Sequence, residues 1–101
     1  MGPERPHPGW WVTIPGGLGL TALLALDPDV YAFWAAHVTR ALSRPSVQTI
    51  GAIAALQHLG EALYAARLAE TIGEPAGGWF VQTLVLGFPS LRLLLRRARG
   101  R

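Results

Sequence analysis

Residues 45–66 read PSVQTIGAIAALQHLGEALYAA and contain one formally charged side chain, that of Glu61. Most of the other residues are Ile, Leu, Ala and Gly. The stretch is long enough to cross a bilayer, because a membrane helix takes roughly 20 residues. A carboxylate inside hydrocarbon is costly, so other polar groups of the chain should compensate Glu61. The stretch therefore predicts a membrane helix with a polar centre.

The remaining charges are segregated along the chain. Residues 6–26 and 75–91 contain no Asp, Glu, Lys or Arg. Charged residues make up 15% of the 101 residues, whereas a soluble domain carries about a quarter. A soluble domain this small would need more polar surface. We therefore predict an all-α integral membrane helical bundle that forms a single domain over residues 1–101; the alternative is a soluble helical bundle with an unusually apolar surface.

Local signals divide this domain into helices. Trp10 and Trp79 open two of the apolar runs, where an aromatic belt would lie at the membrane surface. Asp27 and Pro28 are typical of a helix start, and Pro89 predicts a kink, because it lacks the amide that would bond to a preceding carbonyl. We expect three transmembrane helices at about 10–26, 46–68 and 78–95, a short interfacial helix at about 28–43, and a basic cytoplasmic tail at 96–101.

Arginine positions predict the orientation. With three spans, the loop that carries Arg40 and Arg44 lies on the same side as the arginine-rich tail, while the other side has Arg5 and Arg67. The positive-inside rule then puts the C-terminus in the cytoplasm and the N-terminus outside. The bias toward Ala, Arg, Gly and Pro is typical of a GC-rich genome. We expect a multi-pass protein of a bacterial inner membrane.

The second and third spans carry matching polar residues. Gln57, Glu61 and Tyr64 share a helical stripe, and His58 lies three residues before Glu61. Small residues such as Gly51 and Gly87 would let the helices approach closely. We expect the following side chains to turn inward and bond to one another as a ligand-binding or structural polar centre: Gln57, His58, Glu61, Tyr64, Gln82 and Thr83.

This centre has several interpretations. It could be structural, through interhelical hydrogen bonds, or anchor a lipophilic ligand in an apolar pocket, or handle protons or ions. The pattern identifies no catalytic residue, because no Ser is placed with a paired His and acid. It predicts no metal site or cofactor, since the chain has no Cys and few carboxylates. Its basic residues follow an apolar run, which favours a membrane anchor over nucleic acid.

Two motifs resemble a known family. His58-Leu59-Gly60-Glu61-Ala62-Leu63-Tyr64-Ala65 is similar to the His-x-Gly-Glu-Ser-Leu-Tyr-Ala string of the eukaryotic transmembrane protein 254 family, and Trp79-Phe80-Val81-Gln82-Thr83 with Gly87, Ser90 and Leu91 resembles that family's Trp-Phe-Leu-Gln-Thr, Gly, Ser-Leu pattern. Pro89 departs from the small residue expected there. The resemblance implies a small multi-pass membrane protein without assigned activity, and a sterol-like or other lipid ligand.

Two hypotheses follow for function. The first is a non-enzymatic membrane module that binds a lipophilic small molecule, a membrane-protein partner or a second copy of itself through the polar centre, with the lipid bilayer as its surroundings. The second is a small lipid- or sterol-related enzyme, or an enzyme subunit, that uses His58 and Glu61 as an acid–base pair. The sequence alone leaves open whether the protein is an enzyme.

Overall fold

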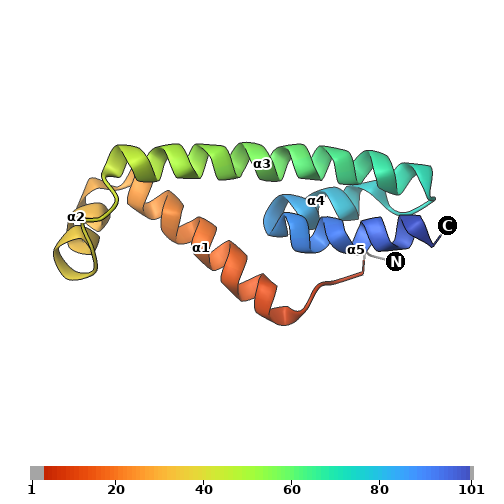
Figure 1. Cartoon of the computed structure of the whole chain (residues 1–101), viewed down its shortest axis with the longest axis horizontal. Coiled ribbons are helices and arrows are strands. Elements are labelled where there is room, and N and C mark those ends of the chain that lie inside the picture. Colours follow the sequence, from red (N-terminus) through yellow and green to blue (C-terminus); the bar gives the residue numbers. More distant parts are fainter. Residues whose placement is uncertain (1–3, 101) are drawn as a thin grey trace.

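A computed structural model describes residues 4–100, and over this range the chain is all-α (Figure 1). The helices are α1 (Pro8–Leu26), α2 (Pro28–His37), α3 (Arg44–Thr71), α4 (Ala76–Leu86) and α5 (Phe88–Arg99). They form an elongated molecule of 52 × 23 × 19 Å. Residue 101, the last of the predicted basic tail, lies outside the described range. The all-α class predicted from the sequence is confirmed for the described residues.

Capping side chains and prolines mark where α2 and α3 begin. Asp27 caps α2, since its Oδ1 accepts hydrogen bonds from the amides of Asp29 and Val30 at 2.9 and 3.3 Å. Pro28 then occupies the first turn, where its missing amide costs nothing. Ser43 caps α3, with its Oγ accepting from the amide of Ser46 at 3.2 Å. The predicted interfacial helix is shorter than expected, because α2 ends at His37.

The long helix α3 is the backbone of the molecule. Its 28 residues give a length of about 42 Å, enough to cross a bilayer with its headgroups. Ala62, Ala65 and Ala69 are fully buried, and these small side chains let α4 and α5 approach α3 closely. The helix ends before Gly73, which adopts a φ of 73° that favours glycine.

The third predicted span, at 78–95, is instead two helices. The chain breaks at Gly87, with φ 68° and ψ −134°, and α5 runs back beside α4 (Figure 1). Pro89 lies in the first turn of α5, a position that suits proline as well as a kink does. The single kinked helix that we expected is therefore wrong, and α4 and α5 form a helical hairpin packed on one half of α3.

Two apolar clusters hold the helices together. The larger joins α3, α4 and α5 through these buried residues: Ala65, Ala69, Trp79, Leu91 and Leu94. The smaller joins α1 to the start of α3 through Leu24, Ala25 and Val47. Between these clusters α1 diverges from α3 (Figure 1).

The hairpin also decides where the ends of the chain lie. Residues 4 and 100, the first and last that the structure describes, are at the α5 end of the molecule, and α2 with the loop after it lies at the opposite end (Figure 1). The side-chain amide of Gln82 donates to the backbone carbonyl of Glu4 at 2.7 Å, which fixes the N-terminal arm there. This position of residues 4 and 100 differs from what three full spans would give, and the sidedness of the termini in a membrane stays a prediction.

One described helix, α1, is long and apolar enough to cross a membrane, and 11% of its apolar window is buried inside the molecule. The low burial distinguishes α1 from the core helix of a soluble protein, which would be mostly covered. The outer face of α3 is also apolar, with large side chains exposed at 42% to 69% at Ile50, Ile53, Leu56, Leu59 and Leu63. Contiguous exposed apolar surface of this kind marks contact with a membrane or a partner.

Candidate functional site

His58 joins α3 to the hairpin. Its half-buried ring lies at the midpoint of α3, and Nδ1 is 2.8 Å from the carbonyl oxygen of Leu84 in the last turn of α4. The last carbonyls of a helix lack intrahelical partners, so a protonated Nδ1 donates to one of them. His58 therefore caps α4 from the neighbouring helix, which leaves its Nε2 for another contact.

Gly87 is where His58 and Glu61 meet the hairpin. A Cβ placed on Gly87 would lie 3.0 Å from His58 Nε2 and 3.3 Å from Glu61 Oε1. Both side chains thus face the same backbone position, and only glycine leaves room there. No hydrogen bond or ion pair joins His58 to Glu61 within residues 4–100. The turn brings the imidazole and the carboxylate together around one Cα without locking them to each other.

A second polar cluster is buried inside the hairpin. Ser90 Oγ lies 3.1 Å from Gln82 Nε2, which donates to it, and 3.0 Å from Thr83 Oγ1. All three side chains are at most 4% exposed. Buried polar groups are costly unless they are bonded, so this cluster favours the register in which α5 packs on α4. Sequence reasoning did not place Ser90 in the centre, although Ser90 belongs to the motif that carries the family resemblance.

The six predicted residues divide into two sets. His58, Glu61, Gln82 and Thr83 gather at the hairpin, from α3 and α4. Gln57 is exposed and the side chain of Tyr64 is 52% exposed, so the inward orientation expected for these two is wrong. The buried face of α3 runs through Ala62, Ala65 and Ala69. Around the helix axis, Gln57 and Tyr64 lie about 100° or more from the middle of this face.

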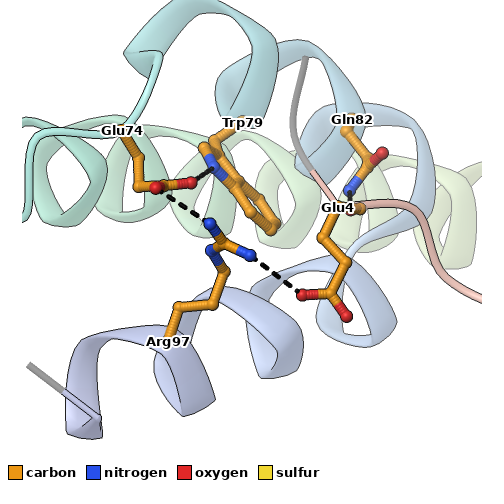
Figure 2. Close-up of polar contacts among 5 residues, drawn as sticks. All are labelled: Glu4, Glu74, Trp79, Gln82 and Arg97. Carbon is orange, nitrogen blue, oxygen red and sulfur yellow. Dashed lines mark hydrogen bonds and ion pairs between the residues drawn. The ribbon is translucent and has the colours of Figure 1, made fainter. Parts of the chain in front are cut away.

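A network of charged groups, missed from the sequence, holds the N-terminal arm (residues 4–7) against the hairpin. Arg97 donates to Glu74 Oε2 at 3.0 Å and to Glu4 Oε1 at 3.3 Å, and the Trp79 indole donates to Glu74 Oε1 at 3.3 Å. Figure 2 shows Arg97 between the two carboxylates. The Glu74 carboxylate, which accepts a hydrogen bond from Arg97, raises the pKa of Arg97 most, and the Glu4 carboxylate raises it further in the same way. No local signal predicts this network, because Glu4 and Arg97 are 93 residues apart.

An apolar groove of about 620 Å³ lies between α1 and α3. Its walls come mostly from small and aliphatic residues, and Thr21, Gln48 and His58 are its polar members. The complete lining is Leu18, Thr21, Ala22, Ala25, Leu26, Gln48, Gly51, Ala52, Ala55, His58 and Leu84. Gln48 Nε2 donates to the carbonyl of Ala25 at 3.0 Å. The groove therefore reaches from the end of α1 to the imidazole at the hairpin turn.

Across the described residues, no group of three or more His, Asp or Glu side chains is placed to hold a metal ion. His58 and Glu61 supply two donors, and His37 lies on α2 with its ring bonded to the Phe33 carbonyl at 2.9 Å. The chemistry that the arrangement can support is hydrogen bonding and charge compensation beside an apolar groove.

With this geometry established, comparison with known families is informative. The transmembrane protein 254 family matches residues 9–96. The chain belongs to this family. The matched range covers all five helices except the last residues of α5 and the first of α1, so the hairpin and its polar centre lie inside it. Comparison with curated proteins and with solved structures finds no match.

Proposed function

We propose that this member of the transmembrane protein 254 family crosses the membrane with α1 and α3, while the α4–α5 hairpin enters and leaves on one side. The apolar α1 and the exposed apolar face of α3 support this placement. At 11 and 12 residues, α4 and α5 are each too short to span, since a crossing takes roughly 20 residues. The arrangement replaces the three spans predicted from the sequence.

The charges support an orientation with both termini in the cytoplasm. The described part of the α5 end carries six arginines and three carboxylates, whereas the α2 end carries two of each. The positive-inside rule assigns the more basic end to the cytoplasm. The predicted cytoplasmic C-terminus is kept in this proposal, and the N-terminus moves to the same side.

The topology can be tested directly, because the chain has no cysteine. We expect single cysteines at His7 and Gly100 to react with a membrane-impermeant maleimide from one side of sealed vesicles, and a cysteine at Ala41 to react from the other. Three full spans would put Gly100 on the side of Ala41. That result would overturn the hairpin placement.

Within this placement, the protein acts as a module that binds one lipophilic molecule in the groove between α1 and α3. The observation that carries the proposal is the groove itself, about 620 Å³ with nearly all of its lining apolar. Ligand pockets are of this size and combine apolar walls with a few polar anchors. His58 at mid-membrane depth and Gln48 near the end of α1 supply the anchors. An acyl chain or a sterol-like molecule with a small polar head fits this pattern.

The enzymatic alternative has less geometry behind it. His58 Nδ1 is engaged by the Leu84 carbonyl, and Glu61 is not among the residues that line the groove. An acid–base pair would need both groups within reach of a substrate.

Photolabelling tests the ligand proposal. A clickable, photoreactive sterol and a fatty-alcohol analogue are added to the reconstituted protein, and the labelled peptides are mapped. We expect labelling of α1 and α3 at the groove, and its loss in Gly51→Leu, which fills the groove. Gly60→Leu is the matched control, because the added side chain points into open space.

Ala55→Leu narrows the same groove and leaves Gly51 unchanged. It keeps the test valid if Gly51→Leu pushes α1 and α3 apart. Labelling that survives both groove variants, or that falls equally in Gly60→Leu, would contradict a ligand in the groove.

A further inference from the structure

The outer face of α5 carries a row of arginines. Arg92, Arg96 and Arg99 are spaced four and three residues apart, which places them within about 60° of one another around the helix. All three are exposed. We refer to these three residues as the arginine stripe.

The orientation of the stripe is fixed by the opposite face of α5. Leu91 and Leu94 are buried in the cluster with Ala65, Ala69 and Trp79, and Ser90 is bonded into the hairpin. Rotating α5 to hide the arginines would expose these leucines and break the serine contacts. The stripe therefore stays on the surface.

The stripe arginines differ from Arg97 in their charge balance. Arg97 lies on another face of α5 and binds both Glu4 and Glu74. Within the described chain, no ion pair or side-chain hydrogen bond involves Arg92, Arg96 or Arg99. Three positive charges on one face are thus left without a protein counter-charge.

The stripe also lies at a suitable depth. Leu91 and Leu94 pack against Ala65 and Ala69, within the last two turns of α3, so the start of the stripe lies about 9 Å from the end of that helix. If α3 crosses the bilayer, the stripe runs from the edge of the hydrocarbon into the headgroups. Arginine side chains at this depth extend toward the phosphates.

We propose that the arginine stripe binds the headgroups of anionic phospholipids in the leaflet on the side of both termini. Guanidinium groups bind phosphate oxygens through paired hydrogen bonds. The inference rests on the membrane placement proposed above and adds a lipid preference to it. A basic residue near an anionic surface favours binding by about fivefold, the equivalent of ~1 kcal/mol, so the full stripe gives up to a hundredfold or so.

Native mass spectrometry of the full chain tests this preference. The protein is reconstituted in nanodiscs of equal parts phosphatidylglycerol and phosphatidylcholine and then released with its bound lipids. We expect the unmodified chain to keep phosphatidylglycerol in excess, by about fivefold or more. The triple variant R92Q/R96Q/R99Q should show a ratio near one, and raised salt should reduce the excess.

A second triple variant, R5Q/R40Q/R67Q, removes the same number of charges from exposed positions outside the stripe. We expect it to keep most of the preference. Equal losses in the two triples would show an effect of net charge and overturn the stripe as the binding surface. No excess in the unmodified chain would overturn the proposal outright.

Three further measurements separate the remaining outcomes. The single variants Arg92→Gln, Arg96→Gln and Arg99→Gln should each lose part of the phosphatidylglycerol excess. They keep the test valid if circular dichroism shows that the triple variant R92Q/R96Q/R99Q misfolds. Tighter binding of a short DNA than of phosphatidylglycerol, lost in the same variants, would overturn the choice of lipid as the partner. Failure of the unmodified chain to float with pure phosphatidylcholine vesicles would overturn the membrane placement and this inference with it, whereas flotation without lipid preference overturns this inference alone.

Discussion

Replacing Gly87 by alanine tests the hairpin turn and the polar centre together. Gly87 has φ 68° and ψ −134°, a backbone conformation that residues with a Cβ rarely adopt. Forcing alanine into it costs roughly 1–3 kcal/mol. The new methyl group would lie 3.0 Å from His58 Nε2, so the ring must shift. That movement weakens the bond to the Leu84 carbonyl, worth about 0.5–1.5 kcal/mol. We expect Gly87→Ala to reduce the free energy of unfolding by roughly 2–4 kcal/mol.

Unfolding in mixed micelles, followed by circular dichroism as the denaturing detergent is increased, measures this loss. Gly73→Ala is the first control, because Gly73 has a φ of 73° and a Cβ there meets nothing within 4 Å. It carries a similar positive φ without the contact. Gly60→Ala is the second control, at an open helical position where alanine should be neutral or stabilising by up to about 1 kcal/mol.

A double-mutant cycle isolates the contact itself. His58→Ala removes the ring, so Gly87→Ala should cost less in that background, with a coupling of about 1 kcal/mol. A cost of Gly87→Ala no larger than that of Gly73→Ala, or a cost that is the same with and without the His58 ring, would refute the contact between residue 87 and His58.

Three other predictions concern contacts between elements. Arg97→Gln should free the N-terminal arm, which would be seen as faster motion of a nitroxide attached to a cysteine at position 7. In the unmodified chain the arm should stay bound throughout the alkaline range, because the pKa of Arg97 is raised. The stabilisation that Arg97 gives is lost only as the pH rises through that raised pKa. Ser90→Ala should cost about 1–2 kcal/mol in micellar unfolding, since it removes the hydrogen bonds of Ser90 to the buried Gln82 and Thr83, and a negligible cost would contradict a role in hairpin register. Arg44→Leu and Gln48→Leu should each cost about 0.5 kcal/mol, but the double variant more than their sum. Both side chains donate to the Ala25 carbonyl at 3.0 Å, so additive costs would show that neither replaces the other.

Features set by neighbouring residues could be predicted from the sequence. Asp27 and Pro28 marked the start of α2, because capping depends on the next few amides alone. The prediction of the third span was wrong because a local signal was ambiguous. Pro89 is compatible with a kink in one helix and with the first turn of a new one. The choice depends on Ser90, Leu91 and Leu94 finding partners on α3 and α4, which no local pattern encodes.

The polar centre was predictable in composition and only partly in orientation. Polar residues stand out in an apolar run, which identified His58, Glu61, Gln82 and Thr83. Helical spacing shows which residues share a face, but not which face meets the neighbouring helix. Gln57 and Tyr64 share a stripe with Glu61 at the edge of the buried face, so packing leaves them outside. The contact of Glu4 with Arg97 had no signal, because it depends on the reversal at Gly87.

The contact between Glu4 and Arg97 has a consequence for the order of folding. During synthesis the N-terminal arm emerges before its charged partner, which follows 93 residues later, after the hairpin turn. Closing so long a loop carries a large entropic cost, which is offset only when α1, α3 and the hairpin are already in place. Docking of the arm should thus be the last step in the assembly of the five helices, and a probe on residue 7 would report when a newly made chain has packed α5 into place.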